Sequence, residues 1–240
     1  MKKLLTYIGL SLLIIITNNC QDVLDVNPKG VLTEEQLSGP EYVDGFVNAA
    51  YAFMPRAHAF DTMNPWIASF RSDDAYKGGG GLDDQTPWYQ MEVFSLANAN
   101  VGNNDGVWFS GYQGISRVHT AIRAINAVEE SAYPQKTERL AEMYFLRGWI
   151  YFNLKRRFKW IPYFQEDASA EDIITIPNHP DGAVNDLELW QHIFDDFKFA
   201  ADNLPEVQDE KGRASQYAAK AYLAKTLLWM AYEQDAQNQV

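Results

Sequence analysis

Apolar residues recur every three to four positions over most of the C-terminal two thirds of the chain. This period is typical of amphipathic helices that bury one face. Prolines and polar clusters interrupt it at intervals and separate one helix from the next. The predicted helices cover about 40–54, 108–130, 135–157, 185–203 and 214–233.

The last four of these helices resemble one another in pairs. A shift of 78 residues aligns Ala141 with Ala219, each three residues before a tyrosine. A small residue beside a large aromatic is typical of tetratricopeptide hairpins, in which alanine lets two helices approach closely. The alternative is a chance alignment of two unrelated amphipathic hairpins. We therefore predict an all-α fold with hairpins at about 106–157 and 184–234 and at most short strands.

Residues 55–105 do not follow the helical period. They contain prolines, two Asp-Asp pairs, an Asn-rich stretch and the run Gly78–Gly81, which predict loops with at most short strands. The glycine run lacks the Gly-Lys-Ser/Thr of a phosphate-binding loop, so we interpret it as a flexible tip. Loops of this length in a compact domain are usually functional or disordered. A connector at 158–177 contains a β-like stretch, Ile173–Ile176.

The N-terminus has the pattern of a secretory signal, predicted over 1–19. Two lysines precede 13 mostly apolar residues, Leu4 to Ile16. This run is too short for a membrane-spanning helix, which needs about 20 residues. A buried N-terminal helix is the alternative, but no amphipathic face can be drawn through the run.

Cys20 is the only cysteine of the chain, and it follows the apolar run closely. A lone cysteine in this position resembles that of a bacterial lipoprotein, in which it becomes the acylated first residue. The preceding residues, Thr17–Asn19, depart from the usual motif, which has a small residue before the cysteine. The alternative is a buried free cysteine. We expect a lipid on Cys20 and an extended tether over the rest of 20–32.

Composition excludes several classes of function. The chain has 240 residues, a formal net charge of −12 and a pI near 4.7, which argue against nucleic-acid binding. Its four histidines lack the spacing of metal ligands, and no nucleophile elbow is present. We therefore expect no metal, no cofactor and no catalysis. His119 is predicted to be a satisfied core residue, and Arg147 and Arg213 are predicted to be structural.

The long loop region contains the residue types that bind sugars. An aromatic face can lie under the apolar face of a sugar ring, while carboxylates and amides bond its hydroxyls. Two alternatives remain: the tryptophans could anchor the loop to the core, and the Asp-Asp turn could cap a helix or hold the turn itself. The candidate ligand-binding residues are Trp66, Asp73, Asp74, Tyr76, Trp88 and Tyr89.

Several motifs together resemble SusD/RagB-like outer-membrane lipoproteins. They occur in the family's order and extend over essentially the whole chain. They are CQDVLDVNPKGVLTEEQL (20–37), NAAY (48–51), FRSDD (70–74), AEMYFLRGWIYFNL (141–154) and GRASQYAAKAYLAKTLL (212–228).

The resemblance implies a helical-repeat scaffold with long ligand-binding loops. Such proteins lie on the outer membrane as the partner of a SusC-like TonB-dependent transporter and capture oligosaccharides without catalysis. Family members are longer than this chain, so we expect 33–240 to be the N-terminal part of the fold, incomplete at its C-terminus. The alternative function is a helical-repeat scaffold that binds protein partners or peptides and has no sugar site.

Replacement of the predicted lipid attachment residue tests the anchor. Cys20→Ser removes the thiol to which acyl chains would be attached, and stable anchoring depends on those chains. We expect the variant to leave the membrane fraction when cells expressing it are fractionated. Retention of Cys20→Ser in the membrane at wild-type levels would contradict the prediction.

Overall fold

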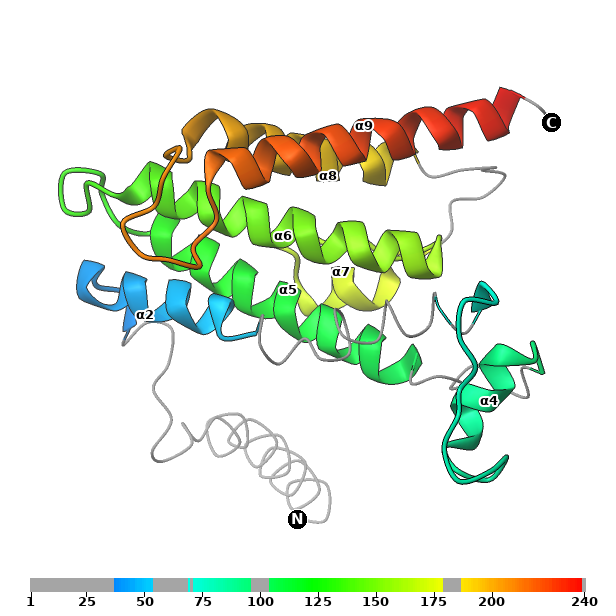
Figure 1. Ribbon diagram of the computed structural model, residues 1–240. Helices are drawn as coiled ribbons and strands as arrows, with labels where there is room; N and C mark the ends of the chain where they lie inside the picture. Colours follow the sequence, from blue (N-terminus) through cyan, green and yellow to red (C-terminus); the bar gives the residue numbers. More distant parts are fainter. Residues whose placement is uncertain (1–36, 54–68, 70, 96–103, 179–186, 239–240) are drawn as a thin grey trace, which may run out of the picture. The chain divides into compact units, whose positions relative to one another are not determined.

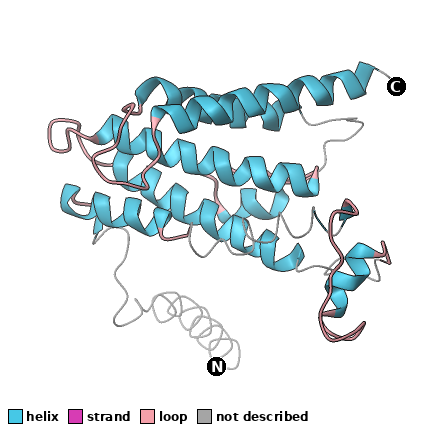
Figure 2. Cartoon of the chain, viewed as in Figure 1, coloured by secondary structure: helices cyan, strands magenta, loops and turns pink. Residues whose placement is uncertain are grey.

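The computed structural model describes residues 37–53, 69, 71–95, 104–178 and 187–238. The regular structure of these residues is helical throughout (Figure 2), which confirms the predicted all-α class. The predicted signal, Cys20, the tether and Trp66 lie outside the described residues.

The long helices begin and end close to their predicted positions. Each carries the apolar period from which it was predicted, and α2 has Pro40 in its first turn, where a proline is well tolerated. The bounds are α2 Pro40–Tyr51, α4 Thr86–Glu92, α5 Asn104–Asn126, α6 Lys136–Phe158, α7 Ala170–Thr175, α8 Leu187–Asn203 and α9 Gln216–Asn238 (Figure 1).

Two short helices correct the sequence prediction. The stretch predicted as β-like, Ile173–Ile176, lies mostly within α7. Ser169 starts this helix with a capping box: its Oγ accepts from the Asp172 amide at 3.1 Å, and the Asp172 carboxylate accepts from the Ser169 amide at 2.8 Å. The hydrogen bonds of the cap stabilise the helix more than the β-branched isoleucines disfavour it. Helix α4, in the predicted loop region, has only seven residues and is too short for a period to reveal it.

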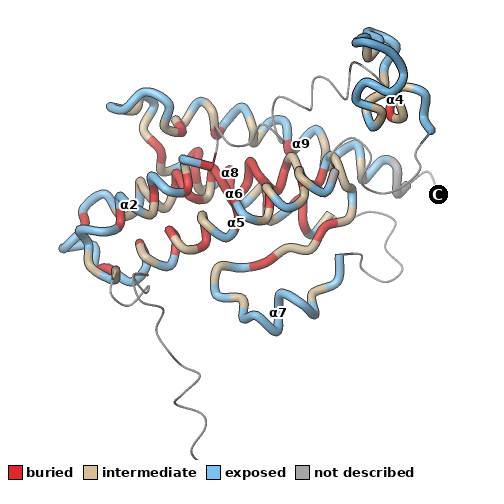
Figure 3. Tube along the Cα trace, turned by 90° about the horizontal axis from the view of Figure 1, so that it is seen from below, coloured by how far each residue is buried: buried red, intermediate tan, exposed pale blue. Residues whose placement is uncertain are grey.

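Helix α6 is the centre of the described bundle. It packs against α2, α5, α8 and α9, while α5 pairs with α2 and α8 pairs with α9 (Figure 1). Buried residues line the facing sides of these helices (Figure 3). Fully buried side chains of the core include Ile115, Ile122, Ile150, Trp190 and Phe197.

The LRGW motif, residues 146–149 within AEMYFLRGWIYFNL, accounts for the close contact between α6 and its neighbours. A Cβ added at Gly148 would lie 3.2 Å from ring atoms of Phe197 on α8, so only glycine fits this spacing without adjustment. Next to it, the indole of Trp149 donates to the Tyr222 hydroxyl of α9 at 2.9 Å. Two adjacent residues of α6 therefore contact both helices of the second pair.

Arg147, also from this motif, forms a buried ion cluster. Its Nε and Nη2 donate to the two carboxylate oxygens of Asp196 on α8 at 2.9 and 2.7 Å, and its Nη1 donates to Glu166 at 2.7 Å. Burial works against the charge, but the Asp196 carboxylate outweighs it and raises the pKa of Arg147 well above its ordinary value. The predicted structural role of Arg147 is thus a link between α6, α8 and the connector.

His119 is buried on α5, as expected, but it is not satisfied as a core histidine usually is. Its Nε2 has no hydrogen-bond partner among the described residues. Burial lowers the pKa of His119 to about 3, and the nearby Arg147 and Arg123 add to the effect. The imidazole is therefore neutral near pH 7.

Helix α9 exposes several large apolar side chains. Tyr217, Leu227, Leu228 and Tyr232 are each at least half exposed, although α9 also buries Ala219 against its neighbours. Its apolar residues thus lie on more than one side, unlike those of a helix with a single buried face. Among the described helices, none combines the length and apolar character needed to cross a lipid bilayer.

The ion cluster predicts a large loss of stability when one partner is removed. Arg147→Met leaves the Asp196 carboxylate buried without its cation, and we expect the free energy of unfolding to fall by about 3–5 kcal/mol. Denaturant unfolding followed by circular dichroism measures the change. As a control, Lys198→Met removes an exposed ion pair with Asp202 and should cost less than about 1 kcal/mol. Equal losses in the two variants would contradict the assignment.

Candidate functional site

The predicted sugar-binding residues that the structure describes lie in one segment, residues 71–95, which we call the α4 segment. Tyr76 is 87% exposed, and the half-buried Trp88 and Tyr89 lie on helix α4. The Lys77 amide donates to the Glu92 carboxylate at 2.8 Å, which joins the chain beside Tyr76 to α4. Because Trp88 and Glu92 are four residues apart, they lie on the same side of that helix.

The acidic turn of this segment is held by its own hydrogen bonds. Asp73 adopts a left-handed conformation, with φ of 63°, and the Ser72 hydroxyl donates to the Asp74 carboxylate at 2.9 Å. Asp74 therefore has a local partner that helps to hold the turn, while the Asp73 carboxylate is exposed. This geometry supports the alternative in which the pair shapes the loop.

Hydrogen bonds also hold the run Gly78–Gly81, for which the sequence predicts a flexible tip. The Lys77 ammonium donates to the carbonyls of Gly81, at 2.8 Å, and Asp84, and the Gly80 amide donates to the Asp84 carboxylate at 2.9 Å. Three of the glycines have positive φ, a conformation that side chains disfavour. The glycines thus let a tight loop form around the lysine.

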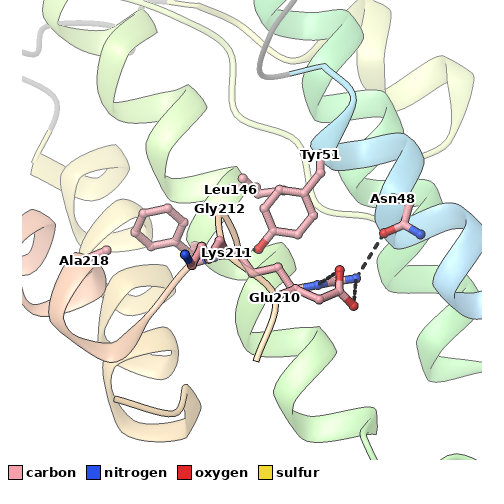
Figure 4. Close-up of a pocket in the computed structure, with 10 residues that line it drawn as sticks. Asn48, Tyr51, Leu146, Glu210, Lys211, Gly212 and Ala218 are labelled. Carbon is pink, nitrogen blue, oxygen red and sulfur yellow. Dashed lines mark hydrogen bonds and ion pairs between the residues drawn. The ribbon is translucent and has the colours of Figure 1, made fainter. Parts of the chain in front are cut away.

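A second candidate site, which the sequence analysis did not predict, is a pocket of about 470 Å³ (Figure 4). We call it the α2–α6 pocket. Its polar side is supplied by α2 and by loop residues 210–214 between α8 and α9, and its apolar side by α6 and α9. Its lining includes Asn48, Tyr51, Phe145, Leu146, Arg213 and Ala218.

Arg213 organises the polar side of this pocket. Its Nη1 donates to Glu142 at 3.0 Å and its Nη2 donates to the Asn48 side-chain oxygen at 3.1 Å. Glu210, at the rim, forms a further ion pair with the guanidinium at 3.1 Å. The cation is therefore matched by two carboxylates, and the predicted structural role of Arg213 includes a position on a pocket wall.

Tyr51 lines the α2–α6 pocket next to loop residues 210–214. Its hydroxyl accepts a hydrogen bond from the Ala214 amide at 3.0 Å, and the Arg213 guanidinium lies 5.5 Å from its ring centre. Burial and the neighbouring Glu142 carboxylate raise the pKa of Tyr51. The phenol is therefore neutral at ordinary pH and suits binding better than nucleophilic chemistry.

Three of the sequence motifs meet in this pocket, and AEMYFLRGWIYFNL supplies Phe145 and Leu146. NAAY supplies Asn48 and Tyr51, and the GRAS end of the last motif supplies Arg213, 165 positions from Asn48. The sequence marks these residues only as parts of separate motifs. The spacing of the motifs along the chain does not indicate that they contact one another. Within the described part of the chain, no group of three or more histidine, cysteine, aspartate or glutamate residues is placed to hold a metal ion.

Comparison with known proteins identifies the family. Residues 23–228 match the SusD-like family model described as "Starch-binding associating with outer membrane". A SusD-like protein of Bacteroides ovatus is 30% identical over 166 residues, which are 68% of this chain and 28% of the relative. The chain belongs to the SusD-like family.

Solved structures show the same fold. A laminarin-binding SusD-like protein matches with a TM-score of 0.67 and 26% identity over 82% of this chain and 42% of its own. Surface glycan-binding protein A from Bacteroides fluxus matches with a TM-score of 0.65 and 25% identity, over 83% and 41% of the two chains. This chain therefore spans less than half the length of these relatives.

Removal of one hydroxyl tests the contact between α2 and the α8–α9 loop. Tyr51→Phe deprives the Ala214 amide of its acceptor, and a buried hydrogen bond contributes about 1 kcal/mol. We expect hydrogen exchange at Ala214 to accelerate severalfold, measured by NMR. Tyr42→Phe, on an exposed tyrosine of the same helix, should leave it unchanged. Unaltered exchange at Ala214 in Tyr51→Phe would contradict the assigned bond.

Proposed function

We propose that the protein captures oligosaccharides at the outer-membrane surface without catalysis. The observation that carries the proposal is the match of residues 23–228 to a family described as starch-binding and outer-membrane associated. The names of the solved relatives, which refer to laminarin and to surface glycans, support the same class of ligand.

The α4 segment provides suitable chemistry for this ligand. Tyr76, Trp88 and Tyr89 offer aromatic surface, and the segment is rich in carboxylates that can accept hydrogen bonds from sugar hydroxyls. Its carboxylates outnumber its two basic residues, Arg71 and Lys77, so it favours neutral sugars over acidic or sulfated ones. Asp73 remains a candidate ligand because its carboxylate is exposed.

The proposed membrane location and the proposed transporter partner rest on the resemblance to SusD/RagB-like lipoproteins and on the family match. A lipid on Cys20 would hold the protein at the membrane, and the tether in 20–32 would give it reach. The partner is a SusC-like TonB-dependent transporter, to which the captured glycan passes. The family description, which places such proteins at the outer membrane, supports this arrangement.

A helical-repeat scaffold that binds protein partners is the second candidate. The exposed apolar side chains of α9, Leu228 and Tyr232 among them, favour it because patches of this kind commonly mark interaction sites. This function predicts no sugar binding at all. A glycan titration therefore distinguishes the two.

Replacement of one loop tryptophan tests the proposed site. Loss of the Trp88 ring removes stacking area, so we expect Trp88→Ala to weaken oligosaccharide binding at least about tenfold, equivalent to about 1.4 kcal/mol. Isothermal titration calorimetry with maltohexaose and laminarihexaose measures the affinity, because the variant lacks the indole whose fluorescence would report binding, and circular dichroism verifies folding.

The control replaces an exposed aromatic residue on another element. Tyr232→Ala on α9 should bind both sugars like the wild type. Unchanged affinity in Trp88→Ala would overturn the assigned site. Absence of binding in the wild type across a broad glycan panel would overturn the glycan function and favour the scaffold.

A further inference from the structure

We propose that the α2–α6 pocket is a second binding site, which takes one unit of a neutral sugar. The inference rests on the proposed glycan function but concerns elements other than the α4 segment. Its volume of about 470 Å³ falls within the usual range of small-molecule sites, about 300–1,000 Å³.

The apolar side of the pocket suits the hydrophobic face of a sugar ring. Phe145 and Leu146, adjacent residues of α6, line it together with Ala218 of α9. Phe145 is itself fixed by edge-on contacts with Phe197 and Tyr222, at ring distances of 5.7 and 5.9 Å. Its position is therefore set by the core, and the small Ala218 side chain leaves room beside it.

The polar side suits hydroxyl groups and holds its donors in place. Arg213 is fixed by Glu142, Glu210 and Asn48, so its orientation costs little entropy on binding. Carboxylate, amide and guanidinium groups are the side chains that bond vicinal hydroxyls through paired donors and acceptors. Figure 4 shows Asn48 and Glu210 on the opposite side of the pocket from Ala218.

Charge and shape disfavour the other ligand classes. Two carboxylates, Glu142 and Glu210, contact the guanidinium of Arg213 and reduce its attraction for a phosphate or an acidic group. Glu142 is shared with Arg139, and Lys211 also lines the pocket, so the phosphate titration described below is the direct test of the ligand class. Known modes of peptide recognition use an extended groove or an open sheet edge, and this pocket is a hollow between the end of α2, the middle of α6, the start of α9 and loop residues 210–214. A neutral, hydroxyl-rich ligand with an apolar face fits both constraints.

An NMR titration of the purified protein tests the second site. We expect maltohexaose or laminarihexaose to shift the backbone amides of Lys211 and Gly212 and the side-chain amide of Asn48. Ala218→Leu fills the pocket and should weaken this response at least about tenfold. Ala224→Leu, the same change at an exposed position of α9, should leave it unchanged. Asn48→Ala, at an exposed residue, provides a second test if Ala218→Leu fails to fold.

The two sites fail independently in this experiment. In Trp88→Ala, the shifts at Lys211 and Gly212 should persist while those of the α4 segment are lost. Sugar-induced shifts in the α4 segment alone would overturn the pocket and leave the glycan function standing. Absence of shifts anywhere would overturn both, and a response of Gly212 to inorganic phosphate but to neither sugar would overturn the ligand class.

Discussion

Helix α6 carries three charged side chains, Glu142, Arg147 and Lys155, into the core, and the positions of its neighbours depend on the partners that these charges require. An unpaired buried charge costs several kcal/mol, so each must meet its counterion. Lys155 lies 3.9 Å from the Glu233 carboxylate on α9, and Glu142 pairs with Arg139 of its own helix. Between the two helix pairs, Arg147 meets Asp196 on α8, and Glu142 also meets Arg213 from the loop between α8 and α9. The second helix pair is therefore joined to the first by directional contacts as well as by apolar packing, and sliding of one pair along the other would break both.

The same constraint builds the α2–α6 pocket. Arg213 donates one hydrogen bond to the buried Glu142 and another to the exposed Asn48 on α2. These two bonds hold the loop between α8 and α9 beside α2. A loop of this length without such a partner would have to be ordered at the moment of binding, at an entropic cost. The pocket thus derives its rigidity from an ion pair whose first role is to stabilise the fold.

Periodicity was sufficient to predict the long helices, because apolar residues recur along each of them and pack into a continuous core, although those of α9 lie on more than one side. It failed for α7, where the Ser169 cap decides the structure, and for α4, which is shorter than two full turns. Of the six candidate site residues, five lie in the α4 segment and Trp66 lies outside the described residues. Tyr51 and Arg213 could not be predicted as neighbours, since their proximity results from the packing of helices far apart in the chain.

The missing side chain of Gly148 has a consequence for the variation that this fold can accept. A methyl group there would press on Phe197 and on the Cβ of Asp196, at 3.2 Å from each. A larger residue at this position would require Phe197 or helix α8 to shift by a few tenths of an ångström, directly beside the hydrogen bonds from Arg147 to both oxygens of Asp196. The absence of a side chain at Gly148 therefore lets the backbone of α6 approach α8 next to the buried ion pair that joins the two helices.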